Sequence, residues 1–216
     1  MTAPATPVAA TVTVSGLTVA APGTAQTVTL DALVGAKNLD ALPVVNVVTY
    51  DARTGGSTRY ETAAALFDSE FSTGPTDVVL SSGVAFPDAL SASYLAGVFP
   101  TGTLLTAPTA LSAAARRSII SSGVDTVYIT GGTGAVSLGV ENTIKAMHVG
   151  NVQTAPVIKV VRIGGKDRYE TNLLVNERFQ AAPDTVLLAS GKDFPDALAM
   201  GPVAYQGFPL ILTGGT

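Results

Sequence analysis

Two nine-residue segments concentrate charged and aromatic side chains in a chain of which only 13% of residues are charged. They read GGSTRYETA at Gly55–Ala63 and GGKDRYETN at Gly164–Asn172. Each is expected to open a helix, so Arg59 and Arg168 place a cation at the positive end of a helix dipole, where a cation is disfavoured. Such a cation requires an anion, supplied by an acidic side chain or by a ligand. We call the pairs Arg59-Tyr60 and Arg168-Tyr169 the Arg-Tyr turns.

The residues that flank the two arginines have a structural explanation of their own. Thr58 and Asp167 can accept hydrogen bonds from helix amides as N-caps. Glu61 and Glu170 follow three residues later, where a capping box places a glutamate. The sequence therefore assigns these glutamates to helix capping and leaves the arginines as the candidate ligand groups.

A second motif also occurs twice and contributes acidic candidates. It reads SSGVAFPDAL at Ser81–Leu90 and ASGKDFPDALAM at Ala189–Met200, with a proline that marks a helix start. Asp88 and Asp196 are then first-turn acids, each expected either to pair with the arginine of its own copy or to contact a ligand. A hydrolase that uses the two carboxylates as acid and base is a weaker hypothesis, since they occupy equivalent places in separate copies.

The segment ITGGTGAVS, at Ile129–Ser137, offers glycine amides between a predicted strand and a predicted helix. Its spacing only approximates the dinucleotide-binding G-x-G-x-x-G pattern, and no acidic residue ends the next strand at the expected distance. Glycines at such turns more often serve close packing. We therefore predict no nucleotide and no other cofactor.

The composition excludes several classes of function. The chain has no cysteine and one histidine, so disulfides, thiolate metal sites and a cysteine nucleophile are excluded, and no metal site is predicted. A net charge of −4 removes the broad positive field on which nucleic-acid binding depends. The apolar runs are far shorter than the ~20 residues that span a bilayer. Neither nucleic acid nor a membrane is an expected partner.

The motifs recur at a period of about 108 residues, which is the size of a domain. The spacing predicts a first copy over residues 44–156 and a second copy over 157–216 that lacks its later half. Residues 1–43 form an extension outside the repeat. Its Thr/Val alternation over residues 8–30 predicts a short β hairpin or an added edge strand.

Apolar runs and helical patterns alternate through the first copy. Strands are predicted at Val44–Thr49, Asp77–Ser81, Thr103–Thr106, Asp125–Thr130 and Val157–Ile163. Helices are predicted at Arg59–Phe71, Pro87–Gly97, Leu111–Gly123 and Gly134–Met147. Strands that are apolar along their whole length and alternate with helices indicate an α/β fold with a parallel sheet covered on both faces.

These motifs together resemble the cell-wall-binding repeat 2 family of bacterial surface and S-layer-associated proteins. The resemblance covers residues 44–216 and rests on RIGGKDRYETN, on the two PDAL segments with the strands before them, on LLTAPTALSAAARRSI and on VYITGGTGAVS. It implies tandem Rossmann-like α/β modules, usually three in a row with pseudo-threefold packing. It also implies noncovalent anchoring of a surface protein to the cell wall. The residues offer no catalytic constellation, so no enzymatic activity is expected, and the cysteine-free composition suits export in a Gram-positive bacterium.

The implied ligand is an anionic cell-wall polysaccharide or a teichoic-acid-like polymer, with further copies of the repeat as partners. The polymer-facing residues that the resemblance implies are Arg59, Tyr60, Arg168 and Tyr169, with Arg162 and Lys166 in the loop of the second copy. The Ala/Thr/Pro-rich N-terminus is typical of a mature exported chain, so an extracellular, wall-attached location is expected.

Two departures limit this transfer. The first copy has no equivalent of Lys166, and the second copy stops after PLILTGG, with no third copy visible. An alternative function is therefore a structural S-layer or adhesin segment whose repeats pack together without a ligand of their own.

Overall fold

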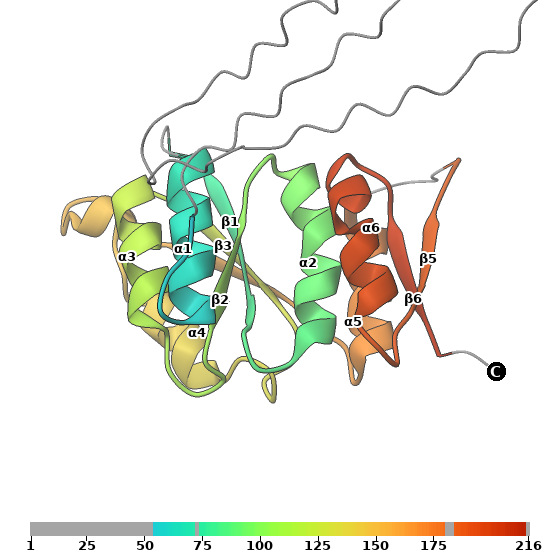
Figure 1. Ribbon diagram of the computed structural model, residues 1–216. Helices are drawn as coiled ribbons and strands as arrows, with labels where there is room; N and C mark the ends of the chain where they lie inside the picture. The colour runs from blue at the N-terminus through green and yellow to red at the C-terminus, as the bar shows by residue number, and fades with distance from the viewer. Residues whose placement is uncertain (1–53, 72–73, 180–183, 215–216) are drawn as a thin grey trace, which may run out of the picture. The chain divides into compact units, whose positions relative to one another are not determined.

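The computed structural model describes residues 54–71, 74–179 and 184–214 (Figure 1). The predicted hairpin over residues 8–30 and the predicted strand at Val44–Thr49 lie outside the described residues. In chain order the elements are α1 (Arg59–Glu70), β1 (Asp77–Ser82), α2 (Phe86–Val98), β2 (Thr103–Thr106), α3 (Ala113–Ser122), β3 (Thr126–Thr130), α4 (Leu138–Lys145), the 3-10 turn η1 (Val149–Asn151), β4 (Lys159–Ile163), α5 (Arg168–Phe179), β5 (Leu187–Ser190), α6 (Pro195–Tyr205) and β6 (Leu210–Thr213).

The elements predicted by range within the described part of the chain are confirmed, most of them with boundaries shifted by no more than about two residues. One helix start differs by more. The helix expected from Gly134 begins only at Leu138, where the Ser137 hydroxyl accepts a hydrogen bond from the Val140 amide. The preceding residues form a turn instead, because the amides of Ala135 and Val136 bond to the carbonyl of Gly132. Serine competes well for an N-cap position, and this cap fixes the helix start.

All strand pairs in the two described sheets are parallel, as the α/β pattern predicts. The first sheet has the order β2-β1-β3-β4, and the second contains β5 and β6. The strand β4 belongs to the predicted second copy, yet it pairs with β3 of the first copy along Thr126–Thr130. The predicted copy boundary at residue 156 therefore runs through one continuous sheet.

Helices cover both faces of the four-stranded sheet, as expected for a buried parallel sheet. Val78 and Leu80 of β1 point into a core shared with α1, α3 and α4. Val79, on the opposite face, points into a second core that contains α2 together with α5, α6 and β6 of the second copy. The described part of the second copy thus shares this core with the first copy.

The two PDAL helices lie side by side, with corresponding residues in contact (Figure 1). Phe86 at the start of α2 meets its counterpart Phe194 at a ring-centroid separation of 5.7 Å. At the other end, a Cβ atom on Gly97 would run into the backbone carbonyl of Tyr205, its own counterpart. Glycine at position 97 therefore permits the close approach that joins the two copies.

Candidate functional site

The first Arg-Tyr turn opens α1 and is held by the predicted capping box. The Thr58 hydroxyl accepts from the Glu61 amide at 3.2 Å, and the Glu61 carboxylate accepts from the Thr58 amide at 3.1 Å. Arg59 is exposed, and its Nη1 donates to the carbonyl of Gly83, just beyond β1, at 2.6 Å. The guanidinium therefore lies at the carboxyl edge of the sheet, where parallel α/β folds bind ligands.

The second Arg-Tyr turn repeats this arrangement with a modified cap. Asp167 Oδ1 accepts from the amides of Tyr169 and Glu170 at 3.0 and 2.9 Å. The Glu170 carboxylate accepts from the Lys166 amide at 2.6 Å, one residue before the position that a capping box predicts. The half of the predicted capping box in which Asp167 accepts from the helix amides is therefore formed. The other half is not, because Glu170 bonds the Lys166 amide in place of the Asp167 amide.

Arg168 lies at the junction between the two copies. Its Nη1 donates to the carbonyl of Gly191 at 2.7 Å, matching Arg59 and Gly83 in the first copy. Its guanidinium carbon lies 5.7 Å from the centroid of the Phe86 ring, which belongs to the first copy. This contact is a cation-π interaction.

The predicted ion pairs within each copy are not formed in the described part of the chain. The ion pairs there are those of Glu141 with Lys145 and with Arg162. Arg168 instead lies near Asp88 of the other copy, where burial raises the pKa of the carboxyl and the guanidinium charge opposes that shift. The physical reason is the packing of α5 against α2, which brings the second arginine to the first PDAL helix and leaves Asp196 exposed.

Asp88 is a largely buried carboxylate, with 9% of its surface exposed. Burial raises the pKa of Asp88 above its ordinary value, and the nearby guanidinium of Arg168 opposes this shift. The carboxylate lies against Gly131, where an added Cβ would come within 2.5 Å of Oδ2. Gly131 also has a φ of +105°, so the glycine loop meets a conformational and a steric requirement at once.

The two tyrosines are half-buried and pack on the glycines that follow β1 and β5. An added Cβ would lie 2.5 Å from the Tyr60 ring at Gly83 and 2.5 Å from the Tyr169 ring at Gly191. Each ring thereby steadies the loop whose carbonyl holds the neighbouring arginine. This packing explains why Gly83 and Gly191 are glycines.

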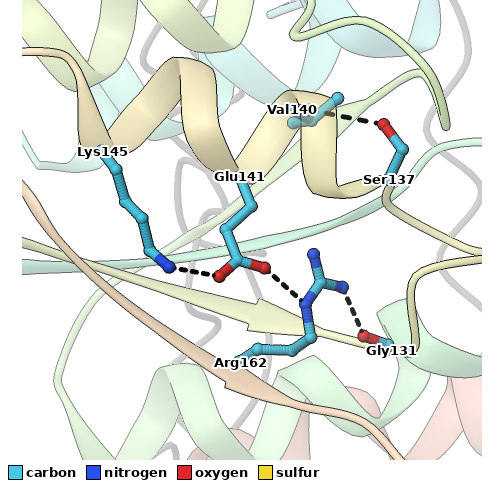
Figure 2. Close-up of polar contacts among 6 residues, drawn as sticks. All are labelled: Gly131, Ser137, Val140, Glu141, Lys145 and Arg162. Carbon is cyan, nitrogen blue, oxygen red and sulfur yellow. Dashed lines mark hydrogen bonds and ion pairs between the residues drawn. The ribbon is translucent and has the colours of Figure 1, made fainter.

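Arg162 is bound to groups of the protein itself, as Figure 2 shows. Its Nε donates to Glu141 at 2.8 Å and its Nη1 to the Gly131 carbonyl at 2.9 Å. Lys145 donates to the other oxygen of Glu141 at 2.6 Å, and this hydrogen bond is the main reason that the pKa of Glu141 is lowered. Arg162 thus ties β4 to α4 and to the glycine loop.

The structure therefore brings together Arg168, Asp88 and Phe86 from two copies. Lys166 is exposed on the loop before α5, and Asp196 is exposed in the first turn of α6. Sequence reasoning missed Phe86 and the carbonyl oxygens of Gly83 and Gly191. The repetition of Phe before PDAL was the available signal for Phe86.

Two kinds of feature are absent from the described part of the chain. No three His, Asp or Glu side chains there gather as metal ligands. No helix there has the length and apolar character needed to span a bilayer.

Comparison with known proteins places these features in context. The family model for Cell wall binding domain 2 (CWB2) matches residues 53–141 and 162–216, and each range contains one Arg-Tyr turn and one PDAL segment. Among solved structures, Cwp6 and Cwp8 from Clostridium difficile superpose with TM-scores of 0.64 and 0.66. Both are 26% identical over 74% of this chain, which covers 24% and 27% of theirs.

Two curated relatives come from Bacillus subtilis strain 168. An amidase enhancer is 32% identical over 169 residues, covering 78% of this chain and 22% of the relative. The N-acetylmuramoyl-L-alanine amidase LytC is 33% identical over 165 residues, covering 76% of this chain and 31% of the relative. The chain thus spans less than a third of each of these relatives.

Proposed function

Because the chain belongs to the cell wall binding domain 2 family, we propose that it attaches a surface protein noncovalently to an anionic polymer of the cell wall. One arrangement supports the proposal above others. In both copies a guanidinium at the first turn of a helix is fixed by a glycine carbonyl. No carboxylate of the described residues forms an ion pair with it.

The free donors of these guanidinium groups suit an anionic ligand. Arginine has five N–H donors, and the hydrogen bond to the glycine carbonyl uses one nitrogen, Nη1, of each group. The helix amides nearby are already capped by Thr58 and Asp167, so the arginine, rather than the bare helix end, is the group that contacts polymer. Two such groups on one chain give a polymer two attachment points, which raises avidity.

Asp88 gives the second turn a charge that responds to the ligand. Ionised Asp88 attracts Arg168 when no polymer is bound, and its burial makes that charge costly. Protonation of Asp88 leaves Arg168 with more uncompensated positive charge. Lys166, exposed on the same loop, adds a second cation for a phosphate or uronate group.

Further copies of the repeat are proposed as partners that pack against exposed apolar side chains of the second copy. Large apolar side chains are exposed there on α5, β5 and α6, among them Leu173, Leu188 and Leu198, at 47, 60 and 59%. Exposed apolar patches of this kind mark interaction surfaces. The alternative of a purely structural S-layer or adhesin segment rests on the same surface, with no ligand at the Arg-Tyr turns.

The relatives named amidase and amidase enhancer motivate a place for this chain at the cell surface. We assign it the wall-binding part of such a protein and no catalytic step. Asp88 is largely buried while Asp196 is exposed on α6, an asymmetry that does not favour the hydrolase hypothesis.

The test is retention of the whole chain on purified sacculi, intact or chemically stripped of their anionic polymer. We expect retention on intact sacculi only, and weaker retention when Arg59 and Arg168 are both replaced by alanine. Arg117→Ala, which removes an exposed arginine from α3, is the matched control and should bind normally. Equal retention on stripped sacculi would refute the polymer as ligand.

A further inference from the structure

Among the differences between the two copies, one decides whether a side chain forms hydrogen bonds to the outer edge of a strand. When the Arg-Tyr turns are aligned, Asn172 on α5 stands where α1 has Ala63. The Asn172 side chain donates to the carbonyl of Leu210 and accepts from the amide of Leu212, each at 2.8 Å. One primary amide thus satisfies two outward-facing backbone groups of β6.

The corresponding edge of β2 carries the same two backbone groups. Val79 lies opposite Thr103, and its amide donates to the carbonyl of Gly102, so the register turns the N–H and C=O of Thr103 and Leu105 away from β1. The Leu105 carbonyl receives the Ser112 hydroxyl at 2.9 Å. Within the described residues, no hydrogen bond reaches the Leu105 amide or the Thr103 carbonyl.

A cavity of about 340 Å³ lies between this edge and α1. Its lining is mostly apolar and includes Ala63, Phe67, Phe71, Thr103 and Leu105, with Glu70 as the charged member. The volume falls near the lower end of small-molecule sites, about 300–1,000 Å³. Alanine at position 63 therefore leaves a cavity with an unused donor and acceptor, where the second copy has an amide.

We propose that this cavity binds the acetamido group of a neutral N-acetylated amino sugar. The sugar amide donates to the Thr103 carbonyl and accepts from the Leu105 amide, as Asn172 does on β6. The acetyl methyl packs among the apolar walls, and a sugar C–H face packs on the partly exposed ring of Phe71. Glu70 accepts a sugar hydroxyl and repels anionic sugars, so this site differs from the Arg-Tyr turns.

The choice of an amino sugar rests on the proposed attachment to the cell wall, whereas the choice of an amide rests on the internal comparison. A helix from another repeat is the rival occupant, since α2 covers the counterpart site and Asn172 donates to Ser91 there at 3.0 Å. The backbone amides of a helix are already paired within it. A helix over β2 would therefore bury the Leu105 amide and Thr103 carbonyl unpaired, which is unfavourable.

The test is a titration of the ¹⁵N-labelled whole chain with N,N′,N″-triacetylchitotriose and, separately, with its de-N-acetylated counterpart. We expect a saturable shift of the Leu105 amide resonance with the acetylated sugar alone. The shift should persist in high salt, since the bound group is neutral.

Three variants sharpen the test. Ala63→Asn supplies the protein's own amide, as in the second copy, and should weaken sugar binding about tenfold or more, at least 1.4 kcal/mol. Ser69→Asn, on the exposed face of the same helix, should leave it unchanged. Arg168→Ala should also leave it unchanged while sacculus retention falls, so that failure of one site is distinguishable from failure of the other.

Three results would each overturn the proposal: no saturable binding of the acetylated sugar, equal binding of the de-acetylated one, or unaltered binding by Ala63→Asn. Self-association of the chain that protects the Leu105 amide without sugar would also overturn it. That result would identify another repeat as the occupant of the cavity.

Discussion

The side-chain nitrogen of Asn172, in the second copy, donates a hydrogen bond to the hydroxyl of Ser91, in the first copy, at 3.0 Å. Both residues are buried, with 1% of their surfaces exposed. The same amide group bonds two backbone groups of β6, so it joins α5, β6 and α2 at one point. The Asn172 side chain therefore stabilises both the fold of the second copy and its packing against the first copy.

Asn172→Ala should lower the free energy of unfolding by about 1–3 kcal/mol for each buried group left unpaired. The measurement is urea unfolding followed by circular dichroism. Leu173→Ala, at the neighbouring and 47% exposed position, is the control and should change stability little. Equal losses in the two variants would contradict a specific role for the amide.

Arg168→Ala should weaken retention on sacculi by about 1.5–3 kcal/mol, the range for a hydrogen bond to a charged group. Retention of the parent chain should fall with added salt, because salt screens the short-range contacts between the arginines and the polymer. The net charge of −4 adds no long-range attraction to an anionic polymer that could compensate. The checks are a binding isotherm on sacculi at two salt concentrations and a melting curve. A variant that melts earlier yet binds normally would assign Arg168 to the fold alone.

Asp88→Asn should stabilise the chain at neutral pH, and the gain should shrink as the pH falls. The pKa of Asp88 is raised in the fold, so the folded state carries the full cost of the buried charge above that raised pKa. The cost disappears below the ordinary aspartate pKa, where the residue is protonated in both states. Unfolding of parent and variant across pH 4–8 measures the difference between them.

The same substitution should strengthen polymer binding at neutral pH, because Arg168 loses its opposing charge. A stability gain that is constant with pH would exclude titration of Asp88 as its cause. Asp196→Asn, at the exposed counterpart on α6, is the control and should show neither effect.

Glu141→Gln should destabilise the chain strongly, toward the lower end of the about 3–5 kcal/mol that breaking a buried ion pair costs. The variant leaves Arg162, whose side chain is only 17% exposed, without a carboxylate. Lys145→Gln removes the partner that is 48% exposed and should cost about 0–1 kcal/mol. Chemical denaturation of both variants provides the comparison.

The contribution of Glu141 should also depend on pH in the direction opposite to that of Asp88. Its pKa is lowered in the fold, chiefly by the hydrogen bond from Lys145, so the pair stabilises the chain above the ordinary glutamate pKa. That stabilisation is lost as the pH falls through the lowered pKa. A destabilisation by Glu141→Gln that did not diminish in acid would contradict this account.

The sequence alone was sufficient for the order and type of the described elements, because each is specified by local patterning. Apolar runs of four to six residues formed β1, β2 and β3, and the capping box of Thr58 and Glu61 fixed the start of α1. The repeat also identified both Arg-Tyr turns, since residue types and spacing are visible without a fold. The parallel sheet followed from strands that are apolar on both faces.

Contacts between the copies could not be predicted in the same way. The pairing of β4 with β3, across the predicted copy boundary, depends on hydrogen bonds between segments that the repeat period treats as separate. The position of Arg168 over Phe86 and near Asp88 depends on α5 packing against α2. From the sequence, an ion pair between each arginine and the aspartate of its own copy was one of two alternatives. The packing of α5 against α2 instead places Arg168 near Asp88 of the other copy.

Local sequence determined which residues occur at helix starts and strand ends in this protein, because caps, turns and apolar periodicity act over a few residues. Only the tertiary structure decided which of these ends face one another. The reason is that side-chain partners are selected by long-range packing of apolar faces, as where Val175 of α5 shares a core with Leu95 of α2. The same packing closes the edge of β6 with Asn172, whereas Ala63 leaves the edge of β2 open.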